Sequence, residues 1–308
     1  MSTVYVEDVS KFYGKTCILK PMSFTLETGC IFGIIGHNGS GKTTLIKMIA
    51  TLLRPSEGAI RVQGFDTIRD SKKVRGSVGL FIEPERAFYF RLTGRENLMR
   101  IALLRGIPKT QAYKEVDALM TRFDMSDHCN KFVSQYSKGM KVKLNLIAAL
   151  LGNPKVLLLD EPISGLDYQS KATILKIIHE YASSGTTIII CSHDIPEVQQ
   201  ICQKVMLLKK GEVVAIGSPK DLLEELNVDG RIEIQTLNIS DMQDAVVNLI
   251  GSDIIHMRKQ EECLVMLVCN MLESMRTLQR NLHIPYHSIS CSERSLSDYF
   301  IAYEHEED

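Results

Sequence analysis

Short apolar runs alternate along the first two thirds of the chain with segments whose apolar positions recur every three to four residues. The apolar runs have the composition of β-strands and cover 30–35, 155–159, 186–191 and 204–208. Helical periodicity covers 45–50, 95–130, 138–151, 168–182 and 194–201. Strands separated by helices of this length predict a parallel, helix-covered sheet, and therefore an α/β fold.

Shorter strands are predicted on either side of this pattern. Residues 3–7 and 23–26 read as strands that lead into the first apolar run. A turn at 54–58 is followed by a strand at 58–62, and 77–82 predicts another strand. The helical stretch between about 85 and 150 then forms a helical subdomain.

The pattern changes after a helix at 220–226, where Asn227-Val228-Asp229-Gly230 breaks it. Beyond this point, strands are predicted at 231–236, 253–258, 262–268 and 285–290, and helices at 240–250 and 271–282. This β-α-β-β-α-β order predicts a small α+β domain of the ferredoxin-like type. The 308 residues thus divide into domains 1–226 and 227–308.

Residues 36–44 carry the strongest chemical signal, because they fit the pattern G-x-x-x-x-G-K-[ST] between an apolar strand and a helix. In such a P-loop, glycines let the backbone close around a polyphosphate, and N–H groups at the positive end of the helix point at its oxygens. Lys42 is predicted to bind the β- and γ-phosphates, and Thr43 to bind Mg²⁺. The predicted nucleotide-binding residues are Gly36, His37, Asn38, Gly39, Ser40, Gly41, Lys42, Thr43 and Thr44.

Two carboxylates end the apolar strand that begins at Val156. Ligands bind beyond the carboxyl ends of strands in open α/β sheets, so Asp160 and Glu161 are expected in the same site. Asp160 is predicted to hold Mg²⁺, and Glu161 to accept a proton from the water that attacks the γ-phosphate. A solvated acidic turn is the alternative for this segment by itself.

Composition and charge narrow the possible partners. The formal net charge is −1 and there is no block of Lys and Arg, so no nucleic-acid partner is expected. The N-terminus lacks the features of a signal peptide, and no apolar run approaches the roughly 18 residues that a membrane span needs. The chain is therefore expected to be soluble, or attached to a membrane through a partner.

The eight cysteines contain no C-x-x-C pair. Cys17, Cys30, Cys191 and Cys202 lie among apolar residues and are predicted to be small core hydrophobes in a reducing cytosol.

Residues 1 to about 220 resemble the nucleotide-binding subunit of ABC transporters. The signature sequence of that family, usually Leu-Ser-Gly-Gly-Gln, has its counterpart in Tyr136-Ser137-Lys138-Gly139-Met140. The resemblance implies a P-loop NTPase core of the ABC ATPase type, and it implies that Ser137, Lys138, Gly139 and Met140 contact ATP. By itself, Ser137 also fits an ordinary helix N-cap.

Three further segments match the family. Residues 164–167 resemble its D-loop, which implies that Asp167 belongs to the nucleotide site, and His193 resembles its switch histidine beside the γ-phosphate. Tyr13 resembles the aromatic residue that stacks on adenine. A structural histidine and a core or turn tyrosine are the alternatives.

Two residues depart from the family pattern. Glu83 stands where a glutamine is usual; it can approach Mg²⁺ but cannot donate an amide hydrogen bond. Glutamate at this place resembles transporters of lantibiotics and bacitracin-like peptides. Lys138 departs from the signature, and it either attracts the γ-phosphate or faces solvent.

Two more segments bear on partners. Phe88-Tyr89-Phe90 lies where the family docks the coupling helix of its membrane subunit, although core packing of at least one ring is equally expected. The segment 295–300 resembles the Ser-Leu-Glu-Asp-x-Phe ending of efflux-type ATPases.

Together these features predict an ATP-hydrolysing subunit of an ABC exporter that uses ATP and Mg²⁺. It is expected to form a head-to-tail dimer of identical or related subunits and to join a polytopic permease at the cytoplasmic face of the membrane. The alternatives are a soluble ABC-type ATPase that acts on ribosomes or DNA, and a regulatory module that binds ATP without turnover.

Overall fold

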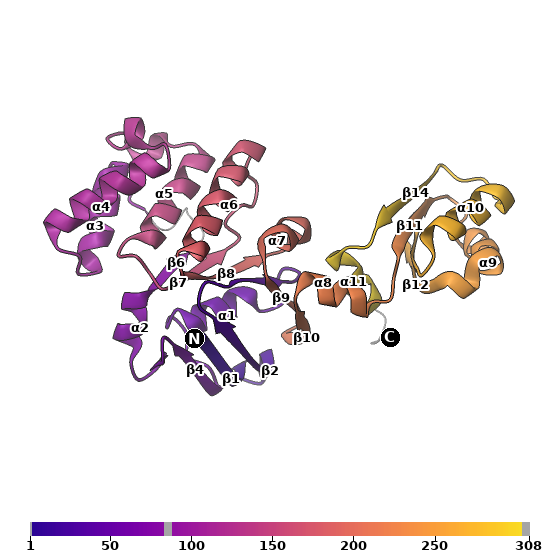
Figure 1. The fold of residues 1–308 in the computed structure, drawn as a ribbon, viewed down its shortest axis with the longest axis horizontal. Helices are drawn as coiled ribbons and strands as arrows, with labels where there is room; N and C mark the ends of the chain where they lie inside the picture. The colour runs from indigo at the N-terminus through magenta and orange to yellow at the C-terminus, as the bar shows by residue number, and fades with distance from the viewer. Residues whose placement is uncertain (1, 83–87, 304–308) are drawn as a thin grey trace. The chain divides into compact units, whose positions relative to one another are not determined.

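Figure 1 shows the computed structural model, which describes residues 2–82 and 88–303. The chain divides into two compact units, Met1–Ile216 and Gly217–Asp308. The division falls before helix α8 (Pro219–Glu225), whereas the sequence places a boundary after it.

A six-stranded sheet with the order β10-β9-β3-β8-β7-β6 lies at the centre of the first unit. Its strands are β3 (Ile31–Ile35), β6 (Val78–Phe81), β7 (Val156–Asp160), β8 (Thr187–Ser192), β9 (Lys204–Lys209) and β10 (Glu212–Gly217). The pairs β6–β7, β7–β8, β8–β3 and β3–β9 are parallel. The predicted parallel sheet is therefore confirmed, and β10 is an addition to it.

The helices of the first unit follow the predicted order, except that α2 was not predicted. They are α1 (Lys42–Ile49), α2 (Ser71–Ser77), α3 (Gly94–Leu104), α4 (Lys109–Arg122), α5 (Lys138–Leu150), α6 (Tyr168–Ser183) and α7 (Ile195–Ile201). Helices α3, α4 and α5 gather into the expected helical subdomain (Figure 1). A capping box at Thr93 and Glu96 begins α3. None of the helices in the described part is long and apolar enough to cross a membrane.

One buried amide joins this helical subdomain to the central sheet. Asn145 of α5 is 4% exposed, and its Nδ2 donates to the carbonyl oxygen of Ile82 at 2.9 Å. Ile82 directly follows β6, so the helix that begins at the signature segment is bonded to the end of a sheet strand.

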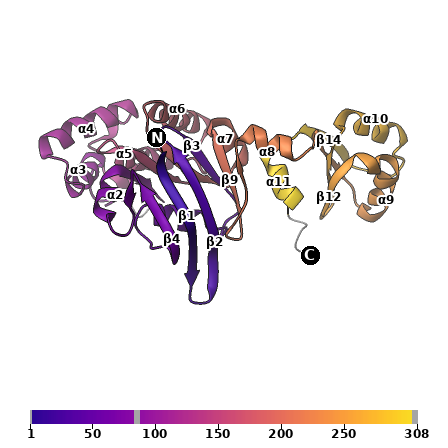
Figure 2. The ribbon, with the colours of Figure 1, turned by 60° about the horizontal axis from the view of Figure 1, so that its bottom comes forward.

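A second sheet, ordered β2-β1-β4-β5, packs beside α1. Its strands are β1 (Ser2–Tyr13), β2 (Thr16–Glu27), β4 (Glu57–Val62) and β5 (Phe65–Asp66). Figure 2 shows β1 and β2 as a long hairpin, which extends well beyond the short strands predicted at 3–7 and 23–26. Stacking of Phe24 on Phe32, with ring centres 5.3 Å apart, joins the two sheets in the core.

The cysteine prediction was wrong for one residue. Cys17 is exposed, because it pairs with Phe12 in the far part of the hairpin, away from the core. Cys191 and Cys202 are buried as expected, and Cys30 is half-buried. Burial raises the pKa of the Cys202 thiol, which keeps that thiol protonated.

The second unit holds the predicted β-α-β-β-α-β series. Its elements after α8 are β11 (Gly230–Gln235), α9 (Ile239–Ile250), β12 (Ile254–Gln260), β13 (Cys263–Val268), α10 (Met271–Asn281), β14 (Ser288–Glu293) and α11 (Leu296–Tyr303). The sheet order is β12-β13-β11-β14, with all three pairs antiparallel. Ile232, Ile234, Leu264 and Met266 are buried in its core.

The segment at 295–300 begins the last helix of this unit. Asp298 Oδ2 accepts a hydrogen bond from the Ser295 N–H at 2.7 Å, which caps the start of α11. Tyr299 is 2% exposed, and its hydroxyl donates to Glu225 of α8 at 2.9 Å. The Tyr299–Glu225 hydrogen bond thus joins α11 to α8 within the second unit.

Candidate nucleotide site

The P-loop joins the buried strand β3 to α1, as its sequence pattern requires. A Cβ at Gly36 would lie 2.2 Å from the carbonyl oxygen of Leu208, so only glycine fits there. Gly41 is the N-cap of α1 with φ of 107°, a conformation that glycine adopts without steric cost. The loop therefore turns tightly over the carboxyl end of the sheet and opens the N-terminus of α1.

Lys42 is 6% exposed and lies folded into the loop. Its ammonium donates to the carbonyl oxygens of Gly36 at 2.6 Å and His37 at 3.1 Å. These carbonyls hold the cation within the loop, where phosphate oxygens would compete for the same hydrogens. Gly36 and His37 therefore act on the site through Lys42.

A cavity of about 490 Å³ brings most of the predicted nucleotide residues together. It is lined by Tyr13, Ile18, Asn38, Gly39, Ser40, Gly41, Lys42, Thr43, Thr44, Asp160 and Glu161. Ile18 is an addition that the sequence did not indicate; it lies on β2, one strand away from Tyr13 on β1. Tyr13 is 55% exposed, and the Lys11 ammonium lies over its ring, 5.1 Å from the ring centre.

Asp160 lies at the bottom of this cavity beside Thr43. The Thr43 hydroxyl donates to Asp160 Oδ2 at 2.7 Å, whereas Oδ1 is buried without a hydrogen-bond partner. Burial raises the pKa of the Asp160 carboxyl, and the Thr43 hydrogen bond opposes that rise. An unpaired buried carboxylate oxygen next to a hydroxyl is a donor set that fits Mg²⁺. Glu83, the third predicted metal ligand, lies outside the described residues.

Glu161 and His193 meet at the ends of neighbouring strands. Glu161 Oε1 and His193 Nδ1 are 2.9 Å apart. The Glu161 N–H donates to the Cys191 carbonyl of β8 at 3.0 Å, and Glu161 has φ of 54°, which is uncommon for a residue with a side chain. His193 does not line the cavity, and the sequence did not indicate its contact with Glu161.

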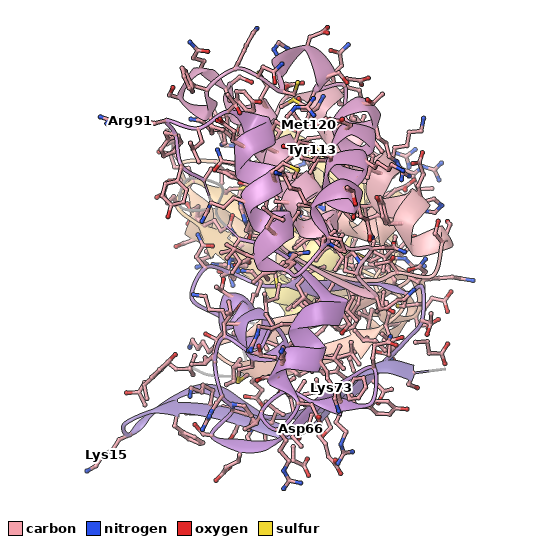
Figure 3. The ribbon with its side chains drawn as sticks, turned by 90° about the vertical axis from the view of Figure 1, so that its left-hand side faces the viewer. Lys15, Asp66, Lys73, Arg91, Tyr113 and Met120 are labelled. Carbon is pink, nitrogen blue, oxygen red and sulfur yellow. The ribbon has the colours of Figure 1, made fainter. Side chains whose placement is uncertain are left out.

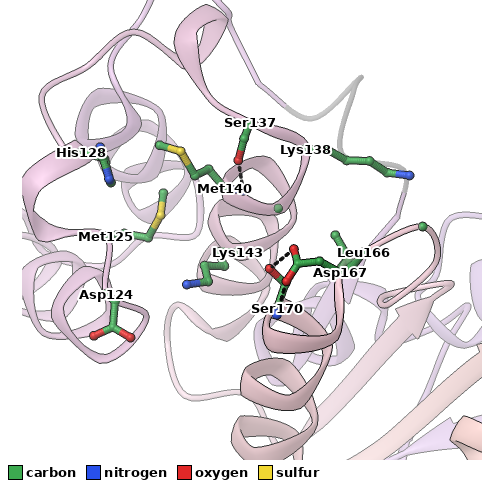
Figure 4. A pocket seen from close by; sticks show the side chains of 12 residues that line it. Asp124, Met125, His128, Ser137, Lys138, Met140, Lys143, Leu166, Asp167 and Ser170 are labelled. Carbon is green, nitrogen blue, oxygen red and sulfur yellow. Dashed lines mark hydrogen bonds between the residues drawn. The ribbon is translucent and has the colours of Figure 1, made fainter.

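The signature residues line a different cavity, of about 390 Å³, which Figure 4 shows. Ser137, Lys138, Gly139, Met140 and Asp167 all line it, and none of them lines the P-loop cavity. Ser137 is the N-cap of α5, and its hydroxyl accepts from the Met140 N–H at 3.2 Å. Within one chain, the structure thus separates two sets of residues that the sequence assigns to one nucleotide.

The D-loop lies beside the signature segment at the second cavity. The Asp167 carboxylate accepts from the N–H and hydroxyl of Ser170, and these hydrogen bonds lower the pKa of Asp167. A Cβ at Gly165 would lie 2.3 Å from Lys138 Nζ. Lys138 therefore packs against the D-loop in this structure.

The aromatic segment after Glu83 divides between core and surface. Phe88 is 7% exposed, while Tyr89 and Phe90 are 58% and 38% exposed. Asn97 fixes Tyr89, since its side chain exchanges hydrogen bonds with the Tyr89 backbone at 2.9 and 3.0 Å. Both exposed rings are faced by cations, Arg100 over Tyr89 at 4.2 Å and Lys141 over Phe90 at 5.3 Å from the ring centres.

Known proteins are similar to this chain in sequence. The family model described as ABC transporter matches residues 19–164. The ABC transporter ATP-binding protein NatA of Bacillus subtilis (strain 168) is 37% identical over 206 residues, 67% of this chain and 84% of that protein. The bacitracin transport ATP-binding protein BcrA of Bacillus licheniformis is 32% identical over 306 residues, 98% of this chain and 97% of that protein.

Solved structures agree with these relatives. CbiO1 from Clostridium perfringens, described as part of the ABC transporter complex cbiONQ, is 30% identical, covers 73% of this chain and 91% of its own, and has a TM-score of 0.66. An ATP-binding subunit of an ABC transporter is 28% identical with a TM-score of 0.67, over 72% of this chain and 92% of its own. The chain therefore belongs to the ATP-binding subunits of ABC transporters, and it is an ATPase.

Proposed function

We propose that two copies of this chain form a head-to-tail dimer that drives export through a separate permease at the cytoplasmic face of the membrane. The observation that carries this proposal is the separation of the two cavities within one chain. If the P-loop cavity of one copy faces the signature cavity of the other, each ATP is enclosed by both. Binding then draws the copies together, and hydrolysis of the γ-phosphate releases them.

The P-loop cavity supplies the groups that hydrolysis requires. Lys42 and the N-terminus of α1 stabilise the charge on the terminal phosphates. Glu161 accepts the proton of the attacking water, and His193 holds the Glu161 carboxylate at the end of β7. In the proposed dimer, Ser137 and the N-terminus of the partner's α5 close the other side of the γ-phosphate.

Thr43 and Asp160 would hold Mg²⁺ in this cavity. The unpaired Asp160 Oδ1 supports this assignment, because a bound cation would pair it. When bound, Mg²⁺ neutralises charge on the β- and γ-phosphates.

Export is supported by relatives that match most of the chain. Besides the bacitracin transport protein, the linearmycin resistance ATP-binding protein LnrL of Bacillus subtilis (strain 168) is 34% identical over 235 residues. The daunorubicin resistance ATP-binding protein DrrA3 of Streptomyces coeruleorubidus is 34% identical over 233 residues. We infer a cargo of the same general class, namely a drug or an antimicrobial compound.

We propose that the permease binds in a groove of about 750 Å³ on the first unit. It is lined by α2, β6 and the C-terminal end of α3, on the side that Figure 3 shows, where Lys73 marks α2 and Tyr113 marks α4. Leu52 and Leu104 line it and are 57% and 75% exposed, and Lys72 and Arg75 add positive charge. Exposed leucines beside cations suit an amphipathic helix with acidic residues.

Leu104→Glu is expected to abolish recovery of this subunit with its permease, because a carboxylate would replace an apolar contact inside the groove. Co-expression of the tagged chain with the permease, followed by pull-down from membranes and an ATPase assay, measures this. Leu272→Glu, at a leucine that is 65% exposed on α10, is the matched control. Sedimentation of the wild-type chain with ribosomes or DNA, without any permease dependence, would contradict the proposed function.

Tyr13→Ala is expected to weaken ATP binding about tenfold, because stacking of a base on an aromatic ring contributes roughly 1–3 kcal/mol. Tyr13→Phe keeps the ring and should bind ATP like the wild type. Titration with a fluorescent ATP analogue compares the three proteins. Equal affinities for all three would show that adenine stacks elsewhere.

A further inference from the structure

Tyr168 is 87% exposed, the highest fraction among the large apolar and aromatic side chains that the structure describes. Single exposed hydrophobic residues are ordinary on protein surfaces, so exposure by itself indicates little. The position of Tyr168 beside the signature cavity is what makes its exposure informative. Tyr168 is the first residue of α6 and directly follows Asp167, which lines the signature cavity.

The backbone that presents Tyr168 is fixed. The Asp167 carboxylate accepts from the Ser170 N–H at 2.9 Å and from the Ser170 hydroxyl at 2.7 Å, which closes the first turn of α6 (Figure 4). Ser170 also packs against the signature segment, because a Cβ at Gly139 would lie 3.3 Å from its Oγ. Because this backbone is already ordered, binding a partner restricts only the side chain of Tyr168, which lowers the entropic cost of the contact.

The positive charge at the start of α5 indicates what the partner carries. Helix α5 begins with Lys138 and has no acidic residue in its first turn. No hydrogen bond or ion pair with another described residue holds the Lys138 ammonium, which lies against Gly165 instead. A cation at the positive end of a helix is unfavourable unless an anion is supplied. The P-loop cavity of a second copy, with ATP bound beside Asp160 and Glu161, supplies that negative charge.

We propose that Tyr168 is an anchor by which one copy of this chain binds an ATP-loaded second copy. This inference rests on the proposed head-to-tail dimer and names a residue that determines its affinity. Tyr168 lies outside the P-loop cavity, so it contributes to association of the copies and not to the binding of ATP by a single copy. Tyrosine is among the residues that most often dominate the energy of such interfaces.

The test uses the full chain with Glu161→Gln, so that ATP is bound but not hydrolysed. Sedimentation in an analytical ultracentrifuge with ATP and Mg²⁺ gives the dissociation constant of the dimer. Adding Tyr168→Ala is expected to weaken dimerisation about 30-fold, the loss typical of an interface hot spot. Tyr168→Phe should retain most of the affinity, and Tyr113→Ala, at a tyrosine that is 43% exposed on α4, should leave it unchanged.

Each possible result of these measurements tests a different part of the proposal. If the parent variant fails to dimerise with ATP, the head-to-tail dimer itself is wrong. If the parent dimerises and Tyr168→Ala dimerises equally well, the anchor role is overturned while the dimer stands. If Tyr168→Ala weakens pull-down of the permease but not dimerisation, Tyr168 contacts the permease and the inference fails. A fluorescent ATP analogue should bind monomeric Tyr168→Ala normally, and weaker binding would contradict the proposed separation of roles.

Discussion

Lys42→Ala is expected to abolish ATP binding, with affinity at least about 100-fold lower than in the wild type. The Lys42 ammonium is buried in the P-loop, and among the described residues that line the P-loop cavity it is the one cationic side chain. Each hydrogen bond between charged groups contributes about 1.5–3 kcal/mol, so loss of two such bonds accounts for an effect of this size. Isothermal titration calorimetry with ATP and Mg²⁺ measures the affinity directly.

Lys15→Ala is the control for this variant, since Lys15 lies at the tip of the β1–β2 hairpin (Figure 3). Removal of Lys42 also leaves the carbonyls of Gly36 and His37 without their donor. A thermal melt of the variant therefore accompanies the titration, to show that the loop still folds. Unchanged ATP affinity in a folded Lys42→Ala protein would contradict the assignment of the P-loop.

Glu161→Gln is expected to lower the rate of ATP hydrolysis by about 10²–10⁴-fold while ATP binding persists. Glutamine has nearly the same shape as glutamate but cannot take the proton of the attacking water. It can still hydrogen-bond to His193, so the local structure should survive. Phosphate release from the assembled transporter measures the rate, and sedimentation should show a dimer that persists with ATP.

Glu180→Gln serves as the matched control, because Glu180 lies at the C-terminal end of α6 and pairs with Arg122 on the surface. That change should leave hydrolysis at the wild-type rate. Equal rates for Glu161→Gln and the wild type would remove Glu161 from the catalytic role. They would also favour a different residue as the proton acceptor.

The elements around the P-loop were predictable because their signals are local. An apolar run, a glycine-rich motif and a helical run follow one another at 30–50, and β3 and α1 end within a residue or two of the expected positions. Helix α2 gave no such signal, since Val74 is its only buried residue. The far half of the β1–β2 hairpin was missed for a similar reason, because residues 10–17 are mostly exposed and show no apolar alternation.

The individual residues of the site could be predicted from the sequence, but which of them lie close together could not. Glu161 and His193 follow different strands, and their contact depends on β7 and β8 being neighbours, which no local pattern encodes. The separation of Ser137 from Lys42 likewise depends on how α5 packs in the helical subdomain. The position of Lys138 against Gly165 was open in the sequence, because two segments far apart in the chain decide it.

The hydrogen bond from Asn145 to Ile82 has a mechanical consequence. It couples two segments of the chain. One is α5, which starts at the signature segment, and the other is Ile82, which immediately precedes Glu83. If the helical subdomain rotates, either Ile82 moves with it or the buried hydrogen bond between Asn145 and Ile82 breaks. We therefore expect a movement of the helical subdomain to reach the chain at Ile82 through this contact, without passing through the P-loop.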